Sequence, residues 1–158
     1  MSFELRLLWA GRHSPAEWET LTADYRKRIA PMAPISERAV KVRGGATGEA
    51  RRRAEGEALA AAAPADAFWV ALDRLGKPID SEGLARRMEK WRAEWPHPVV
   101  FFLGSDLGLD PELVARCRWV LSLGPLTLPH ALARLVLLEQ LYRALSIGAG
   151  IQYHRKPF

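Results

Sequence analysis

Short apolar segments alternate with longer helix-like segments along most of the 158-residue chain, and this alternation constrains the fold more than any other feature. The strand-like segments are 3–10, 35–42, 67–72, 98–103 and 119–121. The helix-like segments are 14–29, 48–63, 81–95, a short one opened by Asp110-Pro111, and 129–147. Strands separated by helices favour an α/β fold with a mostly parallel sheet flanked by helices on both faces. We expect a single domain over residues 1–158, since this length suits one hydrophobic core.

Composition narrows the class of protein. With 49% hydrophobic and 26% charged residues, the chain resembles globular proteins. No apolar run approaches the roughly 20 residues that span a bilayer, and the opening lacks a signal peptide, so we expect a cytoplasmic protein with no membrane partner. A single cysteine, Cys117, and scattered histidines predict a core thiol and no metal site. The net charge of +5 favours polyanionic partners such as RNA, although charge alone is a weak signal.

Glycines indicate where a ligand would bind. The turn after the first strand, Ala10-Gly11-Arg12-His13, lacks the G-x-G-x-x-G pattern of dinucleotide-binding folds. Glycines gather instead behind the last three strands, in 73–78, 104–108 and 122–125. Ligands of open α/β sheets bind at the carboxyl ends of strands, where glycine lets backbone amides approach closely. We interpret the three loops as one pocket, with ordinary strand-to-helix turns as the alternative.

The last helix-like segment begins with Pro129-His130 and is apolar nearly all round. His130 and Arg134 are one turn apart and share a face. A helix with so little polar surface is predicted to be buried on two sides, by its own sheet and by a partner subunit. Glu139 and Arg143 have the i,i+4 spacing of a helix-stabilising ion pair.

The chain then ends in Tyr153-His154-Arg155 and three further residues. An aromatic ring, an imidazole and a cation could stack on a base, share a proton and hold a phosphate. The alternative is an ordinary frayed terminus.

Together these motifs resemble the ribosomal RNA large subunit methyltransferase H family, the pseudouridine-methylating branch of the knotted SPOUT superfamily. The resemblance covers essentially the whole chain. It is carried by Leu72-Asp73 with Gly76-Lys77, 104–108, the stretch from Leu126 to His130, Leu141-Tyr142-Arg143-Ala144 and Tyr153-His154-Arg155.

The resemblance implies a C-terminal deep trefoil knot whose loops bind S-adenosylmethionine, a homodimer, and methyl transfer to N3 of a pseudouridine in large-subunit (23S) ribosomal RNA of the assembled ribosome. By position, the residues implied for the cofactor are Leu72, Gly104, Gly124, Pro125, Leu126, Thr127, Leu128 and Pro129. The chain departs from the family pattern at Ser105, where a second glycine is usual, at Gln152, where proline is usual, and in the added Lys156-Pro157-Phe158.

The reaction assigns roles to the remaining polar residues. The N3 of a uracil ring is protonated near neutral pH, so a base must assist its loss of a proton, and imidazole titrates in the right range. We favour His154, on a mobile tail, over His130, with Tyr153 stacking or hydrogen bonding and Arg155 contacting phosphate. Arg134 and Arg143 are expected to hold RNA or the subunit interface.

A basic segment supplies a candidate RNA-contacting face, with a solvated helix surface as its alternative. Its residues are Arg38, Lys41, Arg43, Arg51, Arg52 and Arg53. Two other functions stay open on the sequence alone: a SPOUT-fold methyltransferase of another RNA, and a ribosome-binding module without catalysis.

Overall fold

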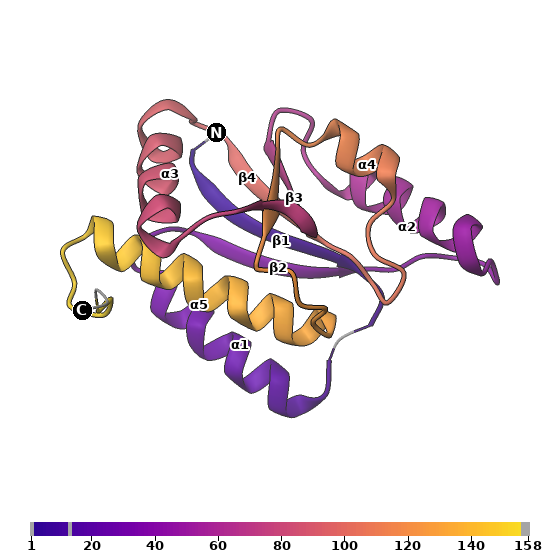
Figure 1. Ribbon diagram of the computed structural model, residues 1–158, viewed down its shortest axis with the longest axis horizontal. Helices are drawn as coiled ribbons and strands as arrows, with labels where there is room; N and C mark the ends of the chain where they lie inside the picture. The colour runs from indigo at the N-terminus through magenta and orange to yellow at the C-terminus, as the bar shows by residue number, and fades with distance from the viewer. Residues whose placement is uncertain (1, 13, 156–158) are drawn as a thin grey trace.

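A computed structural model describes residues 2–12 and 14–155 as five strands in one sheet with five helices around it (Figure 1). The sheet order is β2-β1-β4-β3-β5, and every neighbouring pair runs parallel. The strands are β1 (Glu4–Ala10), β2 (Ile35–Val40), β3 (Phe68–Pro78), β4 (Pro98–Leu103) and β5 (Trp119–Ser122). The helices are α1 (Ala16–Ile29), α2 (Gly48–Ala62), α3 (Ser81–Glu94), α4 (Pro111–Arg116) and α5 (His130–Gly148). The predicted α/β class and parallel sheet are confirmed.

Alternation along the strands divides the interior into two cores. In β4, Val99, Phe101 and Leu103 point to one face of the sheet, and Val100 and Phe102 point to the other. The first face is covered by α1, α3 and α5, and the second by α2 and α4 (Figure 1). Because both faces are buried, all six residues of β4 are buried and apolar, as expected for a central parallel strand.

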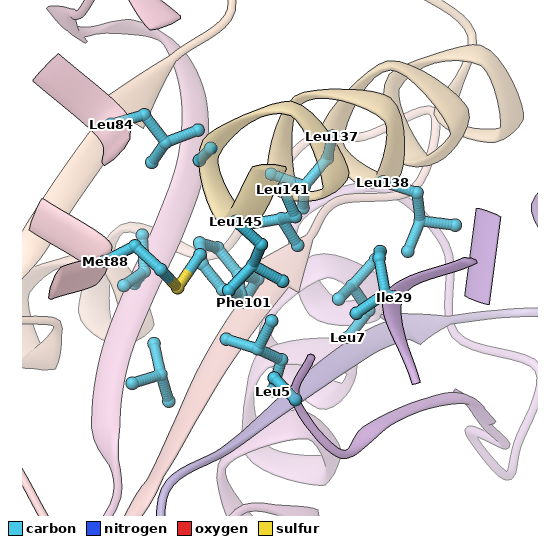
Figure 2. Close-up of a cluster of buried hydrophobic side chains, with 14 of the residues drawn as sticks. Leu5, Leu7, Ile29, Leu84, Met88, Phe101, Leu137, Leu138, Leu141 and Leu145 are labelled. Carbon is cyan, nitrogen blue, oxygen red and sulfur yellow. The ribbon is translucent and has the colours of Figure 1, made fainter. Parts of the chain in front are cut away.

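Helix α5 lies across the first face between α1 and α3, where leucines of its inner surface meet the sheet (Figure 2). Leu137, Leu138 and Leu141 are fully buried, close to Phe101 of β4 and Ile29 of α1. The two-sided burial predicted for this helix is thus supplied within the chain by the sheet and its two neighbouring helices.

The third strand differs from its prediction. The sequence predicts a strand ending at Leu72 and a loop over 73–78, whereas β3 continues to Pro78. Its pairing with β5 breaks between Leu72 and Lys77, and inside the break Asp73 accepts a hydrogen bond from the Leu75 backbone in a local turn. The prediction of a loop over 73–78 is therefore wrong, because this segment belongs to the strand and its pairing with β5 resumes at Lys77.

No helix within residues 2–12 and 14–155 is long and apolar enough to cross a bilayer.

Candidate active site

Two of the glycine-containing loops leave the sheet side by side. Ala71 of β3 is paired with Phe102 of β4, so Leu72 and Gly104 follow on neighbouring strands at the carboxyl edge. The chain after β5 joins them there, because Ser122 pairs with Pro78 and its hydroxyl donates to the Arg74 carbonyl oxygen at 3.1 Å. The structure therefore brings together the three loops that the sequence predicted as one site.

The 104–108 loop is closed so tightly that its first residue must be glycine. A Cβ on Gly104 would lie 2.7 Å from the carbonyl carbon of Gly108, closer than real side chains approach. Gly108 itself has φ +75°, a conformation that L side chains rarely adopt. The loop therefore exposes bare backbone at the sheet edge.

Ser105, at the position where the family usually has glycine, directs its side chain away from that edge. Its hydroxyl donates to Glu55 Oε2 on α2 at 2.8 Å and accepts from the Leu107 backbone at 3.2 Å. Glu55 is buried and also pairs with Arg51 at 3.2 Å. The serine thus fastens the loop to α2.

The 123–129 loop presents unused hydrogen-bond donors. Gly124 has φ +118°, and Leu126 is 75% exposed. Among the described residues, no group accepts a hydrogen bond from the backbone NH of Leu126, Thr127 or Leu128. The first turn of α5 adds more donors, since Pro129 caps the helix without a side-chain hydrogen bond. These amides face solvent, where a polar ligand could accept from them.

His130 begins α5 beside this loop. Burial lowers the pKa of its imidazole from the usual 6.5, the positive charge of Arg134 lowers it further, and the carboxylate of Asp106 opposes both. The influence of Asp106 indicates that the 104–108 loop lies near the start of α5. His130 is therefore a neutral imidazole at pH 7.

The predicted RNA-contacting arginines of α2 differ in their surroundings. Arg51 pairs with Asp106 of the 104–108 loop as well as with Glu55. Arg52 pairs with Glu49 at 2.6 Å, and Arg53 is exposed. The first two belong to ion pairs in this structure, and Arg51 holds the glycine loop.

Arg134 is inside the fold rather than on a surface that RNA could reach. Its side chain is 1% exposed, its guanidinium lies 4.1 Å from the ring centroid of Trp9, and Nη2 donates to Glu19 Oε1 at 2.7 Å. Its Nε lies 3.4 Å from Oε1 of Glu37, a carboxylate that also pairs with Arg26. The sequence predicted that Arg134 holds RNA or the subunit interface; in this chain its guanidinium is instead buried against Glu19 of α1 and Glu37 of β2.

The C-terminal tail is packed against the second half of α5. The Tyr153 hydroxyl donates to Glu139 Oε1 at 3.1 Å, and the Tyr25 hydroxyl of α1 lies 3.4 Å from it. The Tyr153 ring meets Tyr142 edge-on at 4.6 Å between centroids. Burial raises the pKa of Tyr153, and the hydrogen bond to Tyr25 and the charge of Glu139 raise it further, so Tyr153 stays protonated.

Arg143 joins the tail to α5. It pairs with Glu139 at 2.5 Å, as the i,i+4 spacing predicted, and this hydrogen bond raises its own pKa. Its Nη1 lies 3.3 Å from Nδ1 of His154. Because a guanidinium can only donate, Nδ1 accepts this hydrogen bond, and Nε2 lies 3.8 Å from Glu82 Oε1. Arg155 is exposed.

Within one chain the tail, as far as Arg155, does not meet the 104–108 and 122–129 loops. They lie at opposite ends of α5 (Figure 1), a helix of 19 residues and therefore about 28 Å long. The sequence placed both in one site but gave no sign of this separation. It also missed Tyr25 and Glu82 as tail contacts and Glu55 as the anchor of Ser105, because all three come from elements distant in the sequence.

Two further predictions concern sulfur and metals. Burial raises the pKa of the Cys117 thiol to about 11, and the charge of Arg116 lowers it slightly. In residues 2–12 and 14–155, no group of three or more His, Cys, Asp or Glu side chains is placed to hold a metal ion.

The added residues Lys156, Pro157 and Phe158, where the sequence departs from the family pattern, lie outside the described residues.

Comparisons with known proteins agree with these features. Residues 3–154 match the family described as "Predicted SPOUT methyltransferase". Ribosomal RNA large subunit methyltransferase H of Gluconacetobacter diazotrophicus is 43% identical over 151 residues, covering 96% of this chain and 97% of that one. The protein of the same name from Acidithiobacillus ferrooxidans is 43% identical over 154 residues, covering 96% of each chain.

A solved structure supports the fold. A probable methyltransferase from Bordetella pertussis superposes with a TM-score of 0.52 over 90% of this chain and 96% of that one, at 18% identity. Its likeness concerns the architecture only. The sequence match over nearly the full length decides the family: the chain belongs to the ribosomal RNA large subunit methyltransferase H family of SPOUT methyltransferases.

Proposed function

We propose that this protein transfers a methyl group from S-adenosylmethionine to N3 of a pseudouridine in the large-subunit (23S) RNA of the assembled ribosome, in the cytoplasm. The observation that carries the proposal is the meeting of the 72–78, 104–108 and 122–129 loops at the carboxyl edge of a parallel sheet, in a chain of this methyltransferase family. That edge is where open α/β sheets bind ligands.

The loops suit S-adenosylmethionine in their chemistry. The cofactor has polar adenine, ribose and amino-acid parts that accept and donate hydrogen bonds, and the NH groups of Leu126, Thr127 and Leu128 have no acceptor among residues 2–12 and 14–155. The exposed Leu126 can cover a flat ring bound at this edge. The residues proposed to hold the cofactor are Leu72, Gly104, Gly124, Pro125, Leu126, Thr127, Leu128 and Pro129.

When bound, S-adenosylmethionine supplies an electrophilic methyl group on a sulfonium. The protein must remove the N3 proton of the acceptor base and keep water out. His154 is proposed to take this proton on Nδ1, the atom whose lone pair is occupied by Arg143 in the free chain. His130, neutral at pH 7 and next to the cofactor loop, is the alternative base.

The other tail residues position the RNA. Tyr153 remains a neutral phenol, so it can stack on or donate to the target base without competing for the proton. Arg143 and the exposed Arg155 are proposed to contact phosphate after Arg143 releases His154. Arg53 on α2 is a further candidate for RNA contact, and Arg51 and Arg52 could exchange their carboxylate partners for phosphate.

A homodimer is proposed to complete the site. Since the tail and the loops lie at opposite ends of α5 in one chain, a second chain placed antiparallel would bring its tail to these loops. The family resemblance also implies that the C-terminal segment is threaded as a deep trefoil knot. The close packing of β5 and the following residues against β3, where a Cβ on Gly76 would lie 2.7 Å from the Val120 oxygen, is compatible with such threading.

Mixing two inactive variants tests the shared site. His154→Ala removes the proposed base, and Gly104→Val disrupts the cofactor loop. If each site combines the loops of one chain with the tail of the other, co-refolded mixtures recover about a quarter of wild-type activity, because half the dimers carry one intact site. No recovery in mixtures that form heterodimers contradicts the shared site.

Nucleoside mapping tests the reaction. Mass analysis of 23S RNA from a strain lacking the gene should lose one methylated pseudouridine, and the wild-type gene should restore it. The His154→Ala gene should not restore it. Loss of a methyl group from a different RNA would point to another substrate, and an unchanged map would favour a binding module without catalysis.

A further inference from the structure

A continuous row of aromatic side chains runs along the β5 edge of the sheet, away from the glycine loops. Trp91 of α3 lies 5.8 Å from Trp119 of β5 and 5.3 Å from Phe68 of β3, measured between ring centroids. Phe68 in turn meets Trp95 edge-on at 5.7 Å. The row therefore links α3 to the outermost strand of the sheet.

Arginines cover both ends of this row. The guanidinium of Arg87 lies 4.5 Å from the ring centroid of Trp119, and that of Arg118 lies 4.7 Å from the ring centroid of Trp95. On the other face of the sheet, Arg116 lies 4.8 Å from the ring centroid of Trp69. Stacking fixes these guanidinium planes, so little side-chain entropy remains to be lost when they bind a ligand.

These arginines lack the carboxylate partners found elsewhere in the molecule. Arginines of α1, α2 and α5 pair with acids one turn away, as Arg28 does with Asp24 and Arg143 with Glu139. Within the described part of the chain, no acidic side chain forms an ion pair with Arg87, Arg116 or Arg118. Their charge is positioned but not neutralised.

A shallow recess continues the same surface on α3. It has a volume of about 500 Å³, and three of its six lining residues are cations. The lining residues are Ile79, Asp80, Gly83, Arg86, Arg87 and Lys90. We call Arg86, Arg87, Lys90, Arg116 and Arg118 together the β5-edge surface.

The edge itself is open. β5 is last in the sheet order, and among the described residues no strand pairs with its outer side. Arg118 donates its backbone NH to the Trp69 carbonyl at the start of β5, so this end of the surface lies at the amino edge of the sheet, opposite the glycine loops. The Arg118 end of the surface therefore lies away from the proposed methyl-donor site, whereas the recess on α3 begins at Ile79, directly after Pro78.

We infer that the β5-edge surface binds the sugar-phosphate backbone of ribosomal RNA outside the methylated segment. Unpaired arginines with fixed planes match phosphate oxygens, and Trp119 and Trp95, each half-buried, can also stack on an unpaired base. A small enzyme needs such a second contact to dock in one orientation on a ribosome. The inference rests on the proposed rRNA substrate but concerns docking and not methyl transfer.

The test compares salt dependence of binding. The double variant Arg87→Gln/Arg118→Gln should bind large ribosomal subunits at least about tenfold more weakly at 0.1 M salt. The magnitude of the slope of log K against log salt should fall by about two in total, which is about one for each lost phosphate contact. Its affinity for S-adenosylmethionine by calorimetry and its thermal midpoint should match the wild type, which separates this result from failure of the fold or of the proposed reaction.

A matched control removes two charges elsewhere. The variant Lys27→Gln/Arg92→Gln lowers the net charge by the same amount. Arg92 resembles the test arginines because it stacks on an aromatic ring, that of Phe3, but it lies on the side of α3 that contacts Met32. This variant should keep the wild-type slope. Arg87→Lys/Arg118→Lys should recover most of the slope, because charge is retained and only planar stacking is lost.

Three results would overturn the inference. The slope and affinity of the Gln variant could equal those of the control. The loss could disappear when protein-free 23S RNA replaces the subunit, which would indicate a ribosomal protein as the partner. The Gln variant could also unfold while the Lys variant folds but loses about two from the salt slope, which would contradict the recovery expected from its retained charge.

Discussion

Replacing Arg134 with methionine keeps an unbranched side chain of similar volume but removes a buried charge shared by two carboxylates. Arg134 is 1% exposed and joins α5 to Glu19 of α1 at 2.7 Å and to Glu37 of β2 at 3.4 Å. Glu37 has a side chain only 3% exposed, so it cannot turn to water when its partner is lost. The variant should therefore lose stability rather than RNA affinity.

The size of the loss follows from what each partner retains. Removing one member of a buried ion pair typically costs about 3–5 kcal/mol. Glu37 keeps its pair with Arg26, and the Glu19 side chain is 31% exposed, so the lower end applies. Methionine replaces part of the cation–π contact with Trp9 by a sulfur–aromatic contact worth about 1 kcal/mol. We expect the free energy of unfolding to fall by about 3 kcal/mol.

Urea denaturation measures the effect. Arg28→Met is the control, since Arg28 forms an exposed i,i+4 pair with Asp24 and should cost less than about 1 kcal/mol. The double variant Arg134→Met/Glu37→Leu should be more stable than the sum of the single losses predicts, by at least about 1 kcal/mol, because the carboxylate left behind is removed as well. A loss for Arg134→Met no larger than the control, or strict additivity in the double variant, would refute the reasoning.

Further predictions concern the loops, His130 and Cys117. Gly104→Ala places a methyl group against the Gly108 backbone, so S-adenosylmethionine affinity by calorimetry should fall at least about tenfold, whereas Gly45→Ala, with open space around it, should not change it. Because the pKa of His130 is lowered, the folded state binds fewer protons than the unfolded state as the pH falls below 6.5. The free energy of unfolding should therefore decline as the pH falls through that range. In urea titrations, His130→Gln should remove this part of the decline. Cys117, with its pKa raised to about 11, should react with iodoacetamide at pH 8 far more slowly in the folded than in the unfolded protein, and equal rates by mass spectrometry would contradict its burial.

The sequence predicted what depends on local pattern. Continuous apolar runs such as Pro98–Leu103 identify buried parallel strands, and the glycines after three strands predicted loops that meet at the carboxyl edge of the sheet. The Glu139–Arg143 pair also followed from spacing, since helix geometry fixes which residues are neighbours.

What the sequence could not predict depends on long-range packing. The extension of β3 to Pro78 results from pairing with β5, more than forty residues later in the chain. The surroundings of Arg134 come from α1 and β2, which helix periodicity does not specify. The distance between the tail and the glycine loops is set by the length of α5, and this distance is why the site is proposed to need two chains.

Methyl transfer to purified ribosomes tests the central proposal most directly. Assembled ribosomes from a strain lacking the gene are incubated with the protein and S-adenosylmethionine labelled in its methyl group, and the 23S RNA is then digested and mapped by mass. The proposal predicts one labelled methyl group per ribosome on N3 of a pseudouridine, and none with His154→Ala. Label at another nucleotide or in another RNA, or no label from a protein that binds both the donor and the ribosome, would contradict it.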